Sequence, residues 1–164
     1  MGKRRTARIG LIAGVIAAAV AMARGRLRRF EIVEDSMLPA LASGDYVVAV
    51  RRSEAPLRGE IVIFEAPGRP GFDVVKRVVG LPGESVEIGR GAVHIDGSVL
   101  AEPWADGPTF PEGRWDVGGH AVFVLGDRRA ASAGDGRQIG PVDLPRVRWR
   151  VTWRYWPPGR IGRI

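Results

Sequence analysis

At 164 residues, with a net charge of +7 and no cysteine, the chain is long enough to bury one domain core and can form neither a disulfide nor a thiolate zinc site. The positive charge is concentrated in residues 1–29, which hold eight basic residues and no acidic one, whereas residues 30–164 hold 17 basic and 18 acidic residues. A nucleic-acid-binding domain carries its positive charge on its folded part, so this distribution argues against nucleic acid as a partner and favours charges that flank a membrane segment.

An uncharged run covers residues 9–23, between Arg8 and Arg24. It is shorter than the about 20 residues of a typical spanning helix, but flanking arginines can snorkel to the bilayer surface. Two interpretations remain: a retained anchor, and a cleaved signal peptide with Ala21-Met22-Ala23 as its small-x-small site. The basic residues directly after the run favour the anchor. Because four basic residues lie on each side, the positive-inside rule does not set its orientation.

From Phe30 onward the sequence changes to short apolar runs separated by turn signals. This pattern predicts a mostly β domain of short strands, with mixed or antiparallel pairing, over residues 30–164, behind the anchor segment 1–29. Strands are expected at residues 29–33, 46–50, 60–64, 72–79, 85–88, 92–95, 98–100, 121–125 and 147–155. Residues 101–119 are rich in Pro, Gly and acids and predict a loop within a small lobe of about residues 89–120. Apart from the anchor, no helix is predicted.

The last predicted strand alternates between apolar and polar residues, as a half-buried strand does. Its Trp149 and Trp153, together with Trp156, Met37 and Leu38, suggest an apolar surface at the membrane interface. The alternative is that Trp149 and Trp153 belong to the core. The sequence leaves both interpretations open.

Two residues stand out as a nucleophile and its base. Ser36 lies between a strand-like run and a turn at Pro39. Lys76 is the only lysine after residue 3, among sixteen arginines, and arginine cannot replace an amine that must lose its proton. On a strand, Lys76 shares a face with Val74 and Val78, and apolar neighbours disfavour a charged amine. The residues alone leave open an exposed lysine on an edge strand. Neither histidine has an acid in an orienting motif, so a Ser-His-Asp triad has no support.

Four segments resemble, in order, the sequence boxes of type I signal peptidases, which are membrane-anchored serine proteases with a Ser-Lys dyad. Residues 35–45 resemble the nucleophile box, 58–64 the strand that follows it, 76–84 the general-base box, and 126–137 the last box. Together with the anchor, the resemblance covers most of residues 9–140. One such box would be a weak signal, whereas four in order are specific.

The resemblance implies a role for each matching residue. Ser36 would attack the scissile carbonyl and form an acyl-enzyme, with its own backbone N–H as an oxyanion donor. Lys76 would accept the serine proton, pass it to the leaving amine and later activate water. Ser132 would hold the lysine amine in place. Two structural ion pairs complete the set: Arg77 with Asp127, and Asp135 with Arg137. No metal or organic cofactor is implied.

The same resemblance implies the setting in which the enzyme works. Its substrates would be preproteins that carry signal peptides, cut after a small-x-small sequence such as Ala-x-Ala. The chain is expected to be a monomer with one pass through the plasma membrane and its catalytic domain on the extracytoplasmic side. Its partners would be those preproteins and the lipid bilayer.

Three features depart from the family pattern. Glu34 stands two residues before Ser36, where some members place a serine that completes the oxyanion hole, and a carboxylate there could oppose the oxyanion. Arg128 replaces the usual asparagine, and one extra residue separates Ser132 from Asp135. These departures motivate two alternative hypotheses: a catalytically impaired, membrane-anchored binding module of the same fold, and a maturation protease dedicated to a single client.

Overall fold

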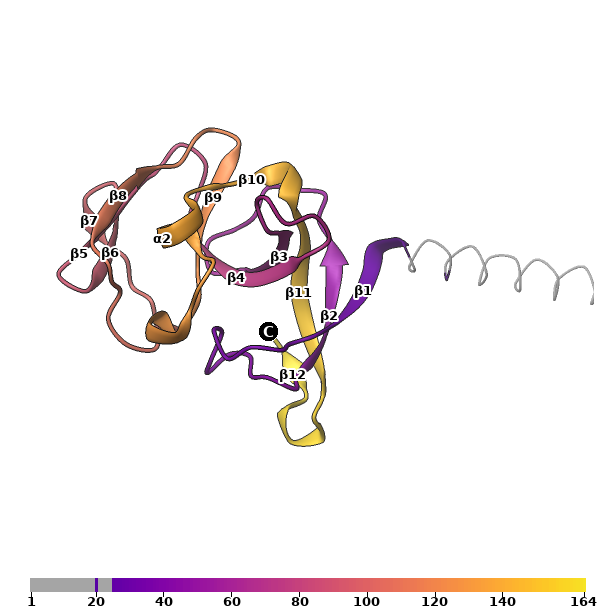
Figure 1. Ribbon diagram of the computed structural model, residues 1–164. Helices are drawn as coiled ribbons and strands as arrows, with labels where there is room; N and C mark the ends of the chain where they lie inside the picture. The colour runs from indigo at the N-terminus through magenta and orange to yellow at the C-terminus, as the bar shows by residue number, and fades with distance from the viewer. Residues whose placement is uncertain (1–19, 21–24) are drawn as a thin grey trace, which may run out of the picture.

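Figure 1 shows the computed structural model, which describes Val20 and residues 25–164. The predicted anchor, residues 9–23, lies outside the described residues except for Val20. Within the described part of the chain, no helix combines the length and the apolar character that crossing a bilayer requires. The domain that follows is mostly β, as the sequence predicts.

Eight strands form the larger sheet, in the order β1-β2-β11-β3-β4-β9-β10, with β12 paired to β11. Their bounds are β1 (Leu27–Glu31), β2 (Tyr46–Arg51), β3 (Ile61–Glu65), β4 (Asp73–Gly80), β9 (Ala121–Leu125), β10 (Val142–Asp143), β11 (Val147–Trp156) and β12 (Gly162–Arg163). Every ladder is antiparallel, which settles the pairing left open by the sequence. Strand β11, late in the sequence, lies between β2 and β3 (Figure 1).

The smaller sheet lies to one side of the larger one and has the order β7-β6-β5-β8 (Figure 1). Its strands are β5 (Ser85–Gly89), β6 (Ala92–Ile95), β7 (Ser98–Val99) and β8 (Gly113–Asp116). The prediction of a loop over residues 101–119 is therefore wrong at β8. Only Trp115 in this strand is apolar, and its ring packs 4.9 Å from that of Phe123. A single apolar residue between charged neighbours gives no readable period.

The prediction of no helix is also wrong in detail. A four-residue helix, α2 (Gly136–Ile139), follows Asp135, whose side chain accepts a hydrogen bond from the Arg137 backbone N–H as an N-cap. Three 3-10 turns are η1 (Arg129–Ala131), η2 (Leu144–Arg146) and η3 (Pro158–Arg160). None of these elements is long enough to produce a helical period in the sequence.

The predicted apolar surface of Met37 and the tryptophans is only partly present, because some of these side chains belong to the core. Met37 is fully buried and Trp149 packs against the same cluster, which joins β2, β3 and β11. The predicted apolar surface is therefore wrong for these two residues. Trp153 and Trp156 are exposed. A register shift after Val151 interrupts the alternation of β11 and separates Trp153 from the inward-facing Trp149.

The two sheets meet at the end of β4, where a glycine allows close approach. A Cβ placed on Gly80 would lie 2.9 Å from Phe123 Cβ and still closer to the Val86 side chain. Val86 and Phe123 belong to the cluster between the sheets. The small sheet thus packs on the far end of β4, and Lys76 lies in the middle of that strand.

Candidate active site

The turn that contains Ser36 connects β1 to β2 and is held in place by buried residues of the turn itself. Met37 and Leu41 are fully buried, and the Leu41 N–H donates to the Met37 carbonyl over 2.8 Å. The buried Asp45 closes the turn by accepting from Arg154 of β11 over 3.1 Å. Ser36 is itself only 2 % exposed. The sequence around the serine therefore builds a rigid platform that presents the hydroxyl to its neighbours.

Lys76 reaches this hydroxyl from the middle of β4. Its Nζ lies 2.8 Å from Ser36 Oγ, at hydrogen-bond distance, although 40 residues separate the two in sequence. Lys76 is 2 % exposed, and strand pairing places it opposite Val62. Val74 and Val78 flank it on the same face. The exposed-lysine alternative is excluded by this burial.

The surroundings of Lys76 favour the neutral amine. Burial lowers the pKa of Lys76 below its ordinary value, and the negative charges of Asp135 and Glu34 act in the opposite direction without cancelling this effect. A neutral amine offers a lone pair, so the Ser36 hydroxyl can donate its proton to Nζ. The arrangement can therefore convert a serine hydroxyl into a nucleophile.

Ser132 lies in the segment that follows β9. Its hydroxyl donates to Asp135 Oδ2 over 2.7 Å. Asp135 also binds Arg137, whose Nε and Nη2 atoms donate to its two oxygens over 3.0 and 2.8 Å. Burial alone would raise the pKa of Asp135, but these bonds from Arg137 and Ser132 outweigh it and hold the pKa below its ordinary value. Among the described residues, no hydrogen bond joins Ser132 Oγ to Lys76 Nζ.

The other implied ion pair is also present. Arg77, next to Lys76 on β4, donates to both oxygens of Asp127 over 2.7 and 2.5 Å, and to the Gly59 carbonyl over 2.7 Å. Asp127 is fully buried, and its burial raises the pKa of Asp127 in spite of the arginine. This pair joins β4 to the end of β9 and so fixes the segment that leads to Ser132.

Gly126 separates Ser132 from the Ser36 turn. A Cβ at this position would lie 2.7 Å from the Ser36 carbonyl oxygen and nearer still to Ser132 Oγ and Cβ, closer than real Cβ contacts allow. The Gly126 N–H donates to Asp135 Oδ2 over 3.2 Å. Only glycine lets the segment after β9 pack directly against the serine backbone.

We therefore expect Gly126→Ala to lower the unfolding free energy by about 1–3 kcal/mol, because an inserted methyl group must displace backbone or Ser132. Thermal unfolding of the purified variant measures this loss. Gly119→Ala is the matched control, since a Cβ there meets nothing within 4 Å and the change should stay within about 0.5 kcal/mol. Equal stability of the two variants would contradict the close packing at Gly126.

Two of the three departures from the family pattern, Glu34 and Arg128, occupy different surroundings. The Arg128 side chain is exposed and lies 3.9 Å from Asp106, while its backbone N–H donates to the Ser36 carbonyl over 3.1 Å. The contact with Ser36 is made by the backbone of residue 128, so it does not depend on whether the side chain there is arginine or asparagine. Glu34 is exposed, and it lines two hollows that Lys76 also lines.

Sequence reasoning missed the residues that shape a hollow beside the dyad. It measures about 260 Å³ and is lined by the strand leading to Ser36 and by the first half of β4. Its apolar lining residues are Phe30, Ile32, Val33, Ile63, Phe72, Val74 and Val75. The available signal was the pair of apolar runs that directly precede Ser36 and Lys76. Whether a groove forms between these two segments depends on how they pack against each other in the fold, and their sequences do not indicate this.

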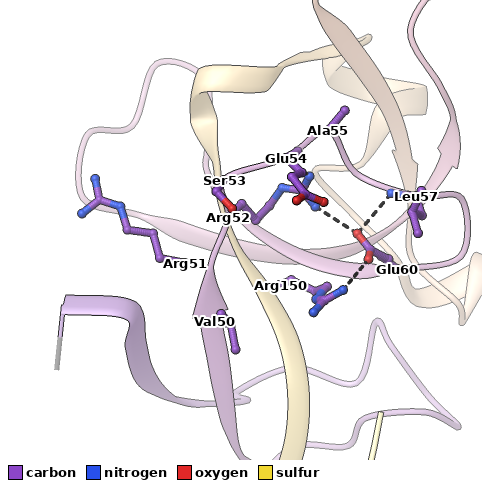
Figure 2. A pocket seen from close by; sticks show the side chains of 9 residues that line it. All are labelled: Val50, Arg51, Arg52, Ser53, Glu54, Ala55, Leu57, Glu60 and Arg150. Atoms are coloured by element: carbon purple, nitrogen blue, oxygen red, sulfur yellow. Dashed lines mark hydrogen bonds and ion pairs between the residues drawn. The ribbon is translucent and has the colours of Figure 1, made fainter. Parts of the chain in front are cut away.

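A different hollow, shown in Figure 2, carries no residue of the dyad. Glu60 lies within it and accepts hydrogen bonds from Arg52 and Arg150, each over 2.9 Å, and from the Leu57 N–H over 3.1 Å. Burial alone would raise the pKa of Glu60, but the bonds from Arg150 and Leu57 hold it below its ordinary value. Glu60 is therefore an ionised partner of two arginines, and we assign no chemistry to this hollow.

Comparisons with known proteins agree on one family. The family model described as signal peptidase, peptidase S26, matches residues 4–156. A probable signal peptidase I-1 from Synechocystis is 32 % identical over 162 residues, covering 88 % of this chain and 82 % of the relative. Signal peptidase I from Leptolyngbya laminosa is 33 % identical, covering 81 % of this chain and 70 % of the relative. The crystal structure of a signal peptidase I from Enterococcus faecalis is similar with a TM-score of 0.51 and 29 % identity, covering 58 % of this chain and 96 % of that one.

Proposed function

Because the chain belongs to the signal peptidase family, peptidase S26, and is a serine endopeptidase, we propose that it removes signal peptides from exported preproteins with Ser36 as nucleophile and Lys76 as general base. The observation that carries the proposal is the distance of 2.8 Å between Lys76 Nζ and Ser36 Oγ inside a buried site. The lowered pKa of the amine supports its role as a general base.

In the proposed acylation step, Ser36 Oγ attacks the scissile carbonyl carbon while its proton moves to Lys76 Nζ. The tetrahedral intermediate collapses when the protonated amine gives that proton to the leaving nitrogen, which breaks the peptide bond and leaves an ester on Ser36. The neutral amine then takes a proton from water while the water oxygen attacks the ester carbon. When this second tetrahedral intermediate collapses, the bond from the carbon to Ser36 Oγ breaks, the Lys76 ammonium returns the proton to Oγ, and the carboxylic acid product leaves.

The oxyanion would be stabilised by the backbone N–H of Ser36. Within residues 25–164, no acceptor takes a hydrogen bond from this N–H, so it is available to a substrate oxygen. Glu34, where some family members place a serine hydroxyl, supplies no second donor while it is ionised. We therefore infer that the Ser36 N–H is the main oxyanion donor in this chain.

Ser132 and Asp135 would act on the base through charge and position. Asp135, with its lowered pKa, stays ionised and favours the ammonium that Lys76 forms after it takes the serine proton. The Ser132 hydroxyl is held by this carboxylate over 2.7 Å. A rotation of the hydroxyl toward Nζ would let Ser132 hold the amine, the role that the family resemblance implies.

Substrate recognition is proposed to use the hollow between the strand before Ser36 and the first half of β4. Its apolar walls and small volume, about 260 Å³, suit small side chains such as those of an Ala-x-Ala site. The substrate would lie as an extended segment along these strands. The basic-flanked run of residues 9–23 would anchor residues 30–164 to the plasma membrane, on its extracytoplasmic side, as a monomer.

The test is cleavage of a preprotein with an Ala-x-Ala site by the purified full chain in detergent, followed from pH 5 to 10. We expect a single cut after the site. On the acidic side kcat/KM should rise with pH, because only the neutral fraction of Lys76 accepts the serine proton and that fraction grows as pH passes its lowered pKa. A rate that is flat from pH 5 to 10 would contradict a lysine base. No cut at any pH, combined with labelling of Ser36 by a serine-reactive penem, would indicate a dedicated client instead.

A further inference from the structure

A buried ion pair outside the dyad joins the small lobe to the segment that follows β9. Arg129, in η1, donates to the two oxygens of Glu102 over 2.6 and 3.2 Å and to the hydroxyl of Thr109. The side chains of Arg129 and Glu102 are only 1 % and 9 % exposed. Burying two charges costs free energy, and replacing such a pair by apolar residues often stabilises a fold. Stability alone therefore does not account for this pair.

Glu102 belongs to the β7–β8 loop, residues 100–112, which also contacts the segment 126–137 through its backbone. The Asp106 N–H donates to the Asp127 carbonyl over 2.8 Å, and the Asp106 carbonyl accepts from the Arg129 N–H over 3.3 Å. Near the end of the loop, the Phe110 carbonyl accepts from Arg137 Nη1. The loop is therefore packed along the segment that contains Ser132 and Asp135.

Two hydrogen-bonded connections lead from Arg129 to Asp135. In the first, Arg129 Nε donates to the Gly126 carbonyl over 2.9 Å, and the Gly126 N–H donates to Asp135 Oδ2 over 3.2 Å. In the second, the Arg129 carbonyl accepts from Arg137 Nη2 over 3.0 Å, and the same nitrogen donates to Asp135 Oδ2 over 2.8 Å. The position of the fully buried Asp135 carboxylate therefore depends on the position of Arg129.

We propose that Glu102 is a positioning residue for the catalytic base. By holding Arg129, it fixes the place of Asp135 and so the charge that surrounds Lys76. The small lobe then contributes to catalysis, although the described linings of the two hollows at Lys76 come from other parts of the chain. This inference rests on the proposed function, in which Lys76 is the base.

The charged groups around Lys76 determine the direction of the expected effect. Burial lowers the pKa of Lys76, and the charge of Asp135 is the strongest that acts against this. Glu34 and Asp127 also raise this pKa, and Arg137 lowers it. If Asp135 and Arg137 move away together, the stronger influence that is lost is the raising one. The pKa of Lys76 then falls further, and the ammonium that forms during acylation is less well stabilised.

Three variants of the full-length chain in detergent test the proposal. Glu102→Gln removes the charge that holds Arg129. The double variant Glu102→Gln with Arg129→Met removes both buried charges, so it should be more stable than Glu102→Gln alone, yet it still lacks the bond to Gly126. Glu112→Gln is the matched control, because Glu112 is an exposed carboxylate of the same loop that accepts a hydrogen bond from the Arg90 N–H.

Cleavage of the Ala-x-Ala preprotein should be slower in both Glu102 variants. We expect kcat to fall by about ten- to a hundredfold, the size of effect that a small displacement of a catalytic group produces. KM should stay within about twofold of wild type, because the described lining of the hollow proposed for the substrate comes from residues 30–36, Ile63 and residues 72–76. The acidic limb of kcat/KM should move to lower pH. A merely structural role predicts instead that activity returns with stability in the double variant.

The titration of Lys76 gives a second readout that does not require cleavage. The chain contains only two lysines, Lys3 and Lys76. Labelling lysine at 13Cε therefore gives two NMR signals, which Lys76→Met assigns. We expect a lower pKa for Lys76 in both Glu102 variants than in wild type, and an unchanged pKa in Glu112→Gln.

Failure of the inference and failure of the proposed function give different results. An unchanged pKa of Lys76 in the double variant, or a kcat for that variant equal to wild type, would overturn the positioning role and leave the peptidase activity in place. A wild type that cuts nothing, together with a lowered pKa of Lys76 in both Glu102 variants, would contradict the proposed function and support the action of Glu102 on Lys76.

Discussion

Lys76→Ala and Ser36→Ala are each expected to abolish cleavage of an Ala-x-Ala preprotein, with kcat falling by about 10³-fold or more. The physical reason is that the 2.8 Å contact between the two side chains is the only route by which the Ser36 proton reaches a base in the described site. Single-turnover cleavage measured with excess enzyme, followed by mass spectrometry of the product, gives the rate without contributions from product release.

Two further substitutions at the same position separate chemistry from folding. Lys76→Met keeps a long side chain in the buried strand and should fold with similar stability, because it removes a polar group without emptying the space. Lys76→Arg keeps a cation that cannot lose its proton, so it should be as inactive as Lys76→Ala. Substantial cleavage by Lys76→Arg would contradict deprotonation as the reason for a lysine at this position.

Asp127→Ala is expected to have the largest effect on stability, a loss of about 3–5 kcal/mol in unfolding free energy. The fully buried carboxylate binds two nitrogens of Arg77, whose side chain is only 11 % exposed. Removing the acid leaves a guanidinium with little access to water, and the ring of Trp104 at 5.0 Å cannot replace the lost charge. Urea unfolding followed by tryptophan fluorescence measures the change.

The double variant Arg77→Met with Asp127→Ala provides the control for this interpretation. It removes both charges, so it should be more stable than Asp127→Ala alone even though it carries one more substitution. The exposed pair of Arg114 and Glu87, 3.9 Å apart, offers a comparison in which Glu87→Ala should cost no more than about 0.5 kcal/mol. A double variant less stable than the single one would show that Arg77 stabilises the fold mainly by other contacts.

The pairing of Ser36 with Lys76 could be predicted from the sequence because both residues stand out by type. A lone lysine among arginines and a serine before a turn are visible without a structure, and apolar neighbours on a β period indicate burial. The strands with continuous apolar runs, such as β3 and β9, were also predicted to within a residue or so, because a buried strand needs nothing but such a run.

Other features depend on pairing between distant segments, which local pattern does not encode. β8 has one apolar residue and exists as a strand because β5 offers it an open edge. The bond from Ser132 to Asp135 is local, but it leaves no periodic pattern in the sequence because it depends on the turn between the two residues and on Arg137, which orients the carboxylate. The hollow that Lys76 lines together with the β3–β4 turn forms only where that turn faces the segment after Ser132. No stretch of sequence short enough to show a period contains both β5 and β8, or both sides of this hollow.

The position of β11 has a consequence for the time at which proteolysis can begin. This strand pairs with β2, which follows the Ser36 turn, and with β3. Strand β3 pairs in turn with β4, the strand that contains Lys76. Its Arg154 also closes the Ser36 turn through Asp45. A nascent chain that has passed residue 137 already contains Ser36, Lys76 and the segment from Ser132 to Arg137, yet it lacks the strand that joins the two halves. We therefore expect the protein to have no proteolytic activity until β11 has been synthesised. A chain truncated before residue 147 should accumulate as an inactive product.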